Sequence, residues 1–562
     1  MLSLALPLLA AATLARARSP YDIPQTEWDA LNSTVGGRLA YGVPLARTCF
    51  QEVGPNVTEG GLDCATVQAN YGVDVFRISQ FGAMSRTQWE TCQKTAQGCL
   101  LDSDNPTDPI AFSPPKKCYQ GSVAPYYISV RTPQDAINAF SFSKRTSVPL
   151  SIMNTGHDFA GRSSGLGTLA LWTHNLKGIT YAPNFVPDKC SGAGIPAMTY
   201  GAGEYLESIY EFADANGITF IGGSHRTVGA AGWTMGGGHS VFTNTYGLGV
   251  DRVRQFRIVT PDGQYRTANE CQNQDLFWAL RGGGGGTFGV VIEMTSEVVP
   301  KPIPTVSLLW TMAFTPENLA RLVNITVENS VRWTEEGWGG YILATTSILA
   351  NPRLNATAAA ASLKPLTDFL QASGAQTQWN NFGTFPPLFD AILNIKIPVG
   401  ANGAVSSRLI PKSLFVNATN RKKLYDATMD TFTLASGGGA IFLTTPYSYP
   451  VKQGSTSITP AWRDAIWHAV VIQGWNWNAT IAEAKQGYTT TSAAADPLRK
   501  IAPGSGAYLN EADVYEPNAP VSFWGTPNYA RLLRVKKKYD PSALLDCWNC
   551  VGTKEKTAAC YL

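Results

Sequence analysis

Two glycine-rich loops carry the residues best suited to holding a cofactor. The first reads Ser151-Ile-Met-Asn-Thr-Gly-His157-Asp-Phe-Ala-Gly-Arg-Ser-Ser-Gly165, and the second reads Gly222-Gly-Ser-His225-Arg-Thr-Val-Gly229. Successive backbone N–H groups in such loops form concave sites for an anion such as a pyrophosphate. Small residues let the backbone approach that ligand closely. A histidine in such a loop is more often a hydrogen-bonding residue than an attachment point, so the pattern alone leaves the role of His157 open.

Two other patterns resemble catalytic motifs but lack the required context. Gly284-x-Gly286-x-x-Gly289 matches a dinucleotide fingerprint, yet it follows a helix-like segment and runs into a strand, which is the reverse of the required order. Gly161-x-Ser163-x-Gly165 matches a nucleophile elbow, which must turn directly into a helix. Residues 166–172 alternate and contain glycine, so no helix is expected there. No GxxxxGK[ST] motif occurs, and nucleotide triphosphate chemistry therefore has no support.

The elements expected around the first loop form an α/β unit. Residues 127–130 predict a short strand, and Pro149–Met153 predict a buried one. Between them, Thr132 is suited to cap a helix that has Pro133 in its first turn and runs to about Arg145. Further strands are expected at 218–221, 253–259 and 290–294, with a hairpin turn at Asp262-Gly263.

The residue composition and the expected secondary structure change at several points along the chain. Residues 20–117 are loop-rich, and glycine density falls after the proline-rich segment 300–304, which we interpret as a linker to a second domain that runs to about residue 500. The C-terminal part contains a helix expected at Tyr529–Tyr539, stopped by Asp540-Pro541. At 562 residues, two or three domain-sized units are expected.

The N-terminal residues 1–18 have the apolar run, small residues and arginines of a secretory signal peptide, and the run is too short to span a bilayer. Charged residues make up only 15% of the chain and the net charge is +3, so neither nucleic acid nor a membrane is expected as a partner. Six glycosylation sequons, at Asn32, Asn56, Asn324, Asn355, Asn417 and Asn478, agree with a secreted, extracellular protein. A monomer is favoured.

The ten cysteines predict disulfides in an oxidising compartment, although the pairing cannot be read from the sequence. The alternative is a metal site. Cys547-x-x-Cys550 has no second CxxC, and the five histidines (157, 174, 225, 239 and 468) form no cluster with ligand spacing. We therefore expect no metal site.

Motifs spread along the chain identify a family resemblance. They are N-T-G-H-D-F at 154–159, T-V-G at 227–229, G-G-G-H at 236–239, Y-G-L at 246–248, D-L-F-W-A-L-R-G-G-G-G-G-T-F-G-V-V at 275–291, Y-L-N-E-A-D at 508–513, F-W-G at 523–525, N-Y-x-R-L at 528–532 and K-K-K-Y-D-P at 536–541. In this order they resemble the vanillyl-alcohol oxidase superfamily, which has a PCMH-type FAD domain, and in particular its berberine-bridge-enzyme-like subgroup.

The resemblance implies an α+β, two-domain fold. An FAD-binding domain would comprise residues 19–300, with its PCMH-type core at about 119–300. A substrate domain at 301–500, an antiparallel sheet backed by helices, would follow. Residues 501–562 would return to the FAD domain as the berberine-bridge-like segment.

The resemblance also implies that His157 is bonded to the flavin 8α-methyl. Many relatives have G-x-C-P-T-V-G, whose cysteine bonds flavin C6, but this chain has His225 and Arg226 in the positions of Cys and Pro. We therefore expect FAD attached covalently through His157 alone. His225 would lie near the isoalloxazine as a donor, a base or simply a loop residue. Val228 occupies the position of the family's oxygen gatekeeper, where valine accompanies oxidases, so O2 is the expected electron acceptor.

The resemblance and the loops together define an expected cofactor site. It comprises Asn154, Thr155, Gly156, His157, Asp158, Gly161, Ser224, His225, Thr227, Val228, Gly229, Gly232, Gly289, Val290, Tyr508 and Asn510.

The implied reaction is hydride transfer from a substrate C–H bond to flavin N5, with a base removing the adjacent O–H proton. Tyr508 is the expected catalytic residue, with a packing aromatic as the alternative. We expect Glu511 on a strand, where it would point to the opposite face from Tyr508. Arg408 and Arg463 are candidate polar groups of the substrate domain.

Carbohydrates, alcohols and secondary metabolites are all possible small-molecule substrates. Two functional alternatives remain at this stage: a secreted hydrolase that uses Ser163, and a binding glycoprotein that has lost catalysis.

Overall fold

The first sheet surrounds the first glycine loop. The computed structural model describes residues 17–393, 399–554 and 558–562. Residues 1–16 of the expected signal peptide therefore lie outside the described residues. The sheet has the order β1-β4-β6-β5, in which β6 pairs with β4 and β5 in parallel. Its strands are β1 (Leu39–Tyr41), β4 (Tyr126–Ser129), β5 (Leu150–Met153) and β6 (Leu169–Trp172).

The helix expected between β4 and β5 is present as α4 (Pro133–Thr146). Thr132 is its N-cap, and Asp135 accepts hydrogen bonds from the backbone N–H groups of Arg131 and Thr132. These contacts satisfy donors that the first turn of a helix leaves unpaired. The glycine loop that begins after β5 therefore emerges from a well-anchored β–α–β unit, and this local prediction is confirmed.

An antiparallel five-stranded sheet lies next in the chain, in the order β10-β9-β11-β8-β7. Its strands are β7 (Ile179–Phe185), β8 (Ile195–Gly201), β9 (Val253–Val259), β10 (Tyr265–Asn269) and β11 (Val290–Glu297). The turn at Asp262-Gly263 joins β9 to β10, and Gly263 has φ +84°, which explains the need for glycine. The strand expected at 218–221 is wrong: only Thr219 makes a bridge, to Val299, because the segment runs straight from α5 (Leu206–Ala215) into the second glycine loop.

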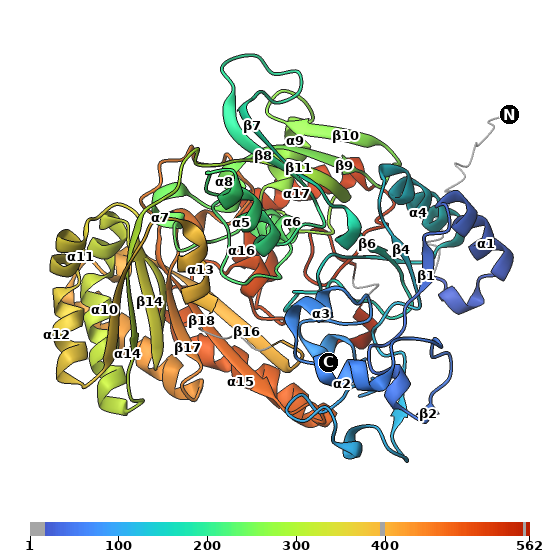
Figure 1. Cartoon of the computed structure of the whole chain (residues 1–562), viewed down its shortest axis with the longest axis horizontal. Helices are drawn as coiled ribbons and strands as arrows, with labels where there is room; N and C mark the ends of the chain where they lie inside the picture. The colour runs from blue at the N-terminus through green and yellow to red at the C-terminus, as the bar shows by residue number, and fades with distance from the viewer. Residues whose placement is uncertain (1–16, 394–398, 555–557) are drawn as a thin grey trace, which may run out of the picture.

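A seven-stranded antiparallel sheet takes its strands from residues 305–475, in the order β15-β12-β14-β13-β17-β18-β16. Its strands are β12 (Thr305–Thr311), β13 (Gly339–Leu343), β14 (Thr346–Asn351), β15 (Gln376–Phe382), β16 (Asn402–Pro411), β17 (Gly439–Leu443) and β18 (Ala465–Trp475). Figure 1 shows helices covering its outer side: α10 (Pro316–Glu336), α11 (Ala356–Ser362), α12 (Lys364–Ala372) and α14 (Ala418–Leu434). Trp310, Trp333 and Trp467 belong to the buried core of this part of the molecule.

The remaining helices connect the sheets or return to the first half of the chain. They are α1 (Gln25–Thr34), α2 (Cys64–Asn70), α3 (Asp74–Ile78), α6 (Ala230–Gly236), α7 (Thr243–Tyr246), α8 (Gly249–Arg252), α9 (Gln274–Leu280), α13 (Phe385–Leu393), α15 (Ile481–Ile501), α16 (Ala519–Trp524) and α17 (Thr526–Tyr539). The helix expected at 529–539 is thus confirmed within α17. It docks on α9, where Lys538 Nζ lies 2.7 Å from a carboxylate oxygen of Asp275.

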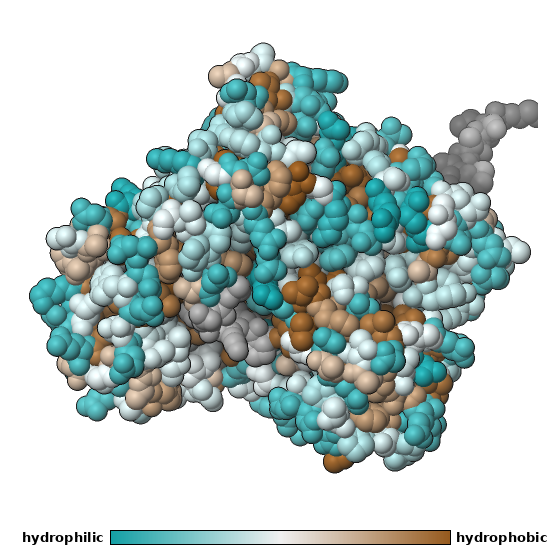
Figure 2. Space-filling view, in the orientation of Figure 1, coloured by the Kyte–Doolittle hydropathy of each residue, from teal (hydrophilic) through white to brown (hydrophobic). Residues whose placement is uncertain are grey.

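All ten cysteines form disulfides: Cys49–Cys64, Cys92–Cys560, Cys99–Cys118, Cys190–Cys271 and Cys547–Cys550. The Cys92–Cys560 bridge holds the C-terminus beside α2 and α3, as Figure 1 shows. Among the described residues, no helix has the length and apolar character needed to cross a membrane. Figure 2 shows polar and apolar residues interspersed on this face, with apolar residues gathered near its middle.

Candidate active site

One large cavity, of about 780 Å³, connects the two glycine loops with the seven-stranded sheet. Its wall includes Asn154–Asp158 from the first loop, Gly223–Arg226 from the second, and side chains of β13, β17 and β18. Residues of the C-terminal segment, among them Tyr508 and Trp548, close it from the remaining side. A ligand pocket of this size assembled from several segments is the default place to look for a cofactor and substrate.

The two loops are held together where they meet. The Thr155 hydroxyl accepts a hydrogen bond from the Gly229 backbone at 3.1 Å, and Asn154 Nδ2 donates to the Ala202 carbonyl at 2.6 Å. Gly156 and Gly161 have φ values of +76° and +72°, which a residue with a Cβ rarely adopts. The sequence places glycine here because the turns require it.

The space in front of these loops fits a long, flat ligand such as FAD. A Cβ added at Gly232 would meet no atom within 4 Å, so a side chain there would project into open space. The Oδ1 atom of Asn154 is buried at the cavity and has no partner in the described chain. An unpartnered polar atom beside small residues and backbone N–H groups is the donor and acceptor set that a dinucleotide needs. The residues present therefore fit FAD.

His157 lies in the middle of this wall. Its Nε2 atom is 2.7 Å from Thr227 Oγ1, and its ring centroid is 4.7 Å from that of His225. Burial lowers the pKa of His157 well below its ordinary value, and His225 and Arg86 lower it further. Burial also lowers the pKa of His225, to about 4. Both imidazoles are therefore neutral near pH 7, and a neutral ring keeps the lone pair that a nucleophile requires.

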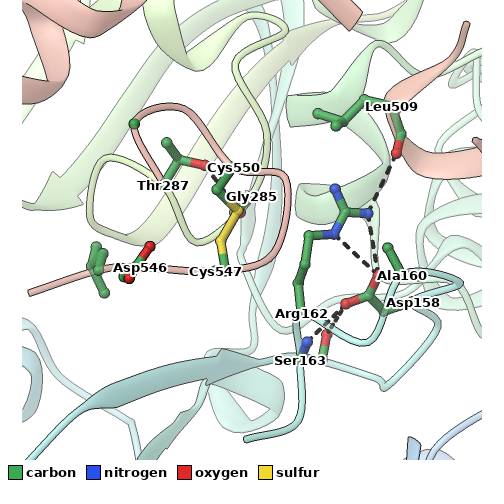
Figure 3. Close-up of a disulfide and its surroundings, with 12 residues drawn as sticks. Asp158, Ala160, Arg162, Ser163, Gly285, Thr287, Leu509, Asp546, Cys547 and Cys550 are labelled. Atoms are coloured by element: carbon green, nitrogen blue, oxygen red, sulfur yellow. Dashed lines mark hydrogen bonds and ion pairs between the residues drawn. A yellow bond between two sulfur atoms is a disulfide. The ribbon is translucent and has the colours of Figure 1, made fainter. Parts of the chain in front are cut away.

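Charged and disulfide-bonded residues brace the end of the cavity near the first loop. Figure 3 shows Arg162 between Asp158, whose Oδ1 is 3.2 Å from Arg162 Nη2, and the Leu509 carbonyl. Ser163 donates its backbone N–H to Asp158 at 2.7 Å, which fixes the turn. In the same view, the Cys547–Cys550 disulfide closes the turn beside Gly285 and Thr287. The C-terminal segment thereby forms part of the cofactor wall.

Nearly all of the residues predicted for the cofactor site line this cavity. The exceptions are Thr227 and Val290. Thr227 is fully buried behind His157, to which it is hydrogen-bonded. Val290 is the first residue of β11 and is buried away from the cavity, whereas its neighbours Gly289 and Val291 line it, because side chains alternate along a strand. The Val290 side chain therefore does not line the cavity, and its expected contact with the cofactor stays a prediction.

The expectation that Glu511 lies on a strand and points away from Tyr508 is wrong. Leu509–Glu511 form a 3₁₀ helix rather than a strand. With three residues per turn, positions 508 and 511 lie on the same side, and both line the cavity. The Tyr508 hydroxyl accepts hydrogen bonds from Gly238 N at 3.2 Å and from Asn510 Nδ2 at 2.9 Å. Burial raises the pKa of Tyr508 far above 10, so its phenol stays protonated.

Two histidines gather around Glu511. His239 Nε2 lies 3.1 Å and His468 Nδ1 lies 3.7 Å from the Glu511 carboxylate, and the two imidazole rings are 5.3 Å apart. One nitrogen or oxygen from each residue lies within 4.8 Å of the others. The expectation that the histidines form no cluster is therefore wrong, because folding joins residues 239 and 468 from distant segments.

The charge state of this cluster follows from burial and mutual attraction. Burial lowers the pKa of His468 to about 3, so it is neutral at physiological pH. Burial acts to raise the pKa of Glu511, but attraction to His239 and a hydrogen bond from it outweigh burial and lower the pKa. An ionised carboxylate therefore faces the hydrogen of one His239 nitrogen, while His239 Nδ1 has no partner in the described chain. This arrangement orients an imidazole to accept a proton.

The two arginines suggested for the substrate domain do not line the cavity. Arg408 donates to the Ala502 carbonyl and lies 3.8 Å from Glu516, and Arg463 is paired with Asp251 at 2.6 Å. Both are fixed by structural contacts. Residues 169–172, which follow the Ser163 motif, form strand β6, as expected, so no nucleophile elbow is present.

The cluster of His239, His468 and Glu511 was missed because its members are far apart in sequence. The one signal that the sequence offers for it is the G-G-G-H segment at 236–239.

Comparisons with known proteins agree with this geometry. A family model described as an FAD binding domain matches residues 124–269, and one described as berberine and berberine like matches residues 507–546. The FAD-linked oxidoreductase ffsJ of Aspergillus flavipes is 38% identical over 570 residues, covering 94% of this chain and 92% of that protein. The FAD-linked oxidoreductase OXR2 of Pyricularia oryzae is 37% identical, with the same coverage of 94% and 92%.

A crystal structure has the same fold over nearly the whole chain. The VAO-type flavoprotein MtVAO615 from Myceliophthora thermophila C1 superimposes with a TM-score of 0.82 at 27% identity, covering 96% of this chain and 98% of that one. The chain therefore belongs to the FAD-linked oxidoreductases of the vanillyl-alcohol oxidase superfamily, in its berberine-bridge-enzyme-like group. It is an FAD-dependent oxidoreductase with the expected α+β, two-domain fold.

Proposed function

We propose that this protein is a secreted oxidase that oxidises an alcohol, a carbohydrate or a secondary metabolite. Bound FAD would accept a hydride from the substrate carbon and deliver the electrons to O2, giving H2O2. The observation that carries the proposal is one continuous cavity with the glycine loops and His157 in one part of its wall and the Glu511 cluster in another. In this scheme residues 19–300 and 501–562 hold the cofactor, and residues 301–500 supply the substrate wall.

His157 is proposed as the single covalent attachment point for FAD. Its neutral, half-buried imidazole and its hydrogen bond to Thr227 support this role. A second bond of the thioether type is impossible because His225 stands at the position of the cysteine. His157→Ala should abolish covalent attachment, whereas His225→Ala should leave it. Flavin fluorescence of the denatured protein on a gel measures both, and fluorescence retained in the His157 variant contradicts the assignment.

The proton acceptor is proposed to be the His239–Glu511 pair rather than Tyr508. The carboxylate orients the imidazole, and the imidazole removes the hydroxyl proton of the substrate as the hydride leaves carbon. The Tyr508 phenol, held protonated by burial, would serve as a hydrogen-bonding wall beside Asn510. His468 is fully buried behind Glu511, with its Nδ1 atom 3.7 Å from that carboxylate.

Val228 is proposed to admit O2. Its side chain is partly exposed at the cavity. Val228→Leu should slow reoxidation of the photoreduced protein by roughly tenfold, because a larger side chain narrows access and a tenfold change corresponds to only 1.4 kcal/mol in a barrier. Stopped-flow absorbance after mixing with O2 measures this without a substrate, and unchanged reoxidation would argue against the role.

Secretion is supported by two observations. The described chain contains five disulfides, which persist in oxidising compartments. The sequon asparagines at 56, 324, 355, 417 and 478 are exposed, and Asn32 is half-buried, so none is hidden in the core. The protein is proposed to act as a monomer, without nucleic acid or membrane partners.

The decisive experiment is to purify the protein from the medium of a secreting host and record its visible spectrum. A yellow protein that releases H2O2 with a member of an alcohol, carbohydrate or secondary-metabolite panel supports the proposal. A colourless protein would refute the proposed oxidase function. A colourless protein inhibited by serine-directed reagents would instead support hydrolysis at Ser163, and a yellow one without turnover or reaction with O2 would support a binding role.

A further inference from the structure

One buried arginine differs from the others in having no acidic partner among the described residues. Arg77, Arg86, Arg252 and Arg408 are the arginines classed as buried in the described chain. Three have a carboxylate within 4.0 Å: Arg77 pairs with Glu90, Arg252 with Glu297, and Arg408 with Glu516. Arg86 is only 5% exposed, yet it forms no ion pair with any described residue. Its Nε atom is also buried without a hydrogen-bond partner.

An uncompensated buried charge is costly, by several kcal/mol even after relaxation. Burial lowers the pKa of Arg86 to about 10, so the guanidinium remains charged at neutral pH. Its central carbon lies 5.0 Å from the ring centroid of Phe159, and such a contact offsets only part of the cost. The missing negative charge is therefore expected from a ligand.

The position of Arg86 shows where that ligand lies. Arg86 lines the cavity, and its charge lowers the pKa of both His157 and His225. Its head group reaches strand β16 of the seven-stranded sheet, since a Cβ added at Gly403 would lie 3.3 Å from Arg86 Nη1. The guanidinium thus sits where the first half of the chain meets the substrate wall.

The segment that carries Arg86 is fixed to the same strand. Thr87 N donates to the Ala401 carbonyl, Thr87 Oγ1 donates to Asn402 Oδ1 at 2.8 Å, and Gln88 Nε2 donates to the Gly403 carbonyl at 2.6 Å. These contacts join residues more than three hundred positions apart. Arg86 is therefore a pre-positioned charge rather than a mobile surface side chain.

We propose that Arg86 forms a subsite for the carboxylate of an acidic substrate with an apolar body, a class that includes hydroxy acids. This inference rests on the proposed function. The neighbouring wall favours an apolar body, because Leu343, Val405, Phe442, Val470 and Ile472 line the cavity. A planar guanidinium binds a carboxylate in bidentate fashion. The FAD pyrophosphate is the other source of an anion, but its expected cradle is the glycine loops, whereas Arg86 reaches toward β16.

The test uses a carboxylate and its uncharged isostere. The flavin-loaded protein is titrated with octanoate and with octanamide, and the change in visible absorbance gives each Kd without turnover. We expect octanoate to bind at least about tenfold more tightly than octanamide. Arg86→Met should remove this preference while leaving the flavin content unchanged, and Arg86→Lys should keep part of it. Arg321→Met is the matched control, because Arg321 also stacks on a phenylalanine, Phe369 at 5.2 Å, but does not line the cavity.

Several outcomes would overturn the proposal. Equal binding of the two probes by the wild type would do so, as would the absence of any response to octanoate up to its solubility limit. Loss of flavin in Arg86→Met with the octanoate preference retained in the remaining holoprotein would assign Arg86 to the cofactor instead. The wild-type comparison decides the matter even if the methionine variant does not fold. A colourless wild type is a separate result, because it refutes the proposed function itself.

Discussion

His157 Nε2 and Thr227 Oγ1 lie 2.7 Å apart although seventy residues separate them in the chain. Thr227 is fully buried, so this hydrogen bond is shielded from water. The Thr227 hydroxyl is also 3.3 Å from His225 Nδ1. One side chain therefore contacts both imidazoles, and it holds the Nε2 edge of the His157 ring in place.

We expect Thr227→Val to slow covalent flavin attachment by about fivefold, because a lost hydrogen bond of about 1 kcal/mol no longer fixes the His157 ring. Valine keeps the shape of threonine and removes only the hydroxyl. Incubating apoprotein with FAD and following acid-stable flavin over time gives the rate. Thr227→Ser is the control and should retain most of it. Equal rates for the valine and serine variants would show that the hydroxyl is not involved.

Glu511→Gln should slow anaerobic flavin reduction by a substrate of the wild type by about 10²-fold or more, the usual contribution of an acid–base group. Glutamine keeps the size but cannot carry the charge that orients His239. Stopped-flow absorbance separates this rate from substrate binding. Glu511→Asp retains the charge and should lose less. A stoichiometric bound metal, detected by elemental analysis of the wild type, or an unaffected rate would refute the proton-acceptor role.

Acidification should destabilise the protein partly through His468. Its folded pKa of about 3 lies below the ordinary value of 6.5, so the folded state binds this proton more weakly than the unfolded state. Stability is therefore lost as the pH falls below 6.5, by about 3 kcal/mol at pH 4 for this group. The pKa of Glu511 is also lowered, and its contribution is lost in the same direction.

Thermal unfolding at pH 7 and pH 4, followed by tryptophan fluorescence, measures this loss. His468→Gln should show a smaller difference between the two pH values than the wild type. An identical difference in the two proteins would mean that His468 is not a source of the acid sensitivity.

The Cys92–Cys560 disulfide closes a segment of 468 residues, whereas Cys49–Cys64 closes only 15. Replacing the first pair by serine should therefore cost about 3 kcal/mol more than replacing the second, because the entropy of the unfolded chain grows with loop length. Differential scanning calorimetry of the two double variants compares them directly. A lower melting temperature for the Cys49→Ser/Cys64→Ser protein would contradict this order.

Local patterns predicted the parts of the fold that depend on local chemistry. Thr132 and Pro133 start α4 as expected, because capping and the fixed φ of proline act within one turn. Gly156 occupies a left-handed turn that its residue type suggests. The strand expected at 218–221 failed because β propensity does not ensure a partner strand, and only Thr219 finds one.

The cavity lining was predictable where neighbours in sequence are neighbours in space, and the loop around His157 does line the cavity. The Glu511 cluster could not be predicted, since its three members come from a glycine loop, strand β18 and a 3₁₀ helix. The sequence also could not predict that Arg86 lacks an acidic partner among the described residues, because only the folded chain shows which arginines have acidic neighbours.

The Cys92–Cys560 bridge also sets the order of events during biosynthesis. Cys92 must keep a reactive thiol until Cys560 emerges, and at about 5–20 residues per second the intervening chain takes roughly half a minute or longer to synthesise. Tyr508, Asp546 and Trp548 belong to the same late segment and to the cavity wall. The cavity wall therefore cannot be completed until this late segment has been synthesised and Cys560 has reached Cys92.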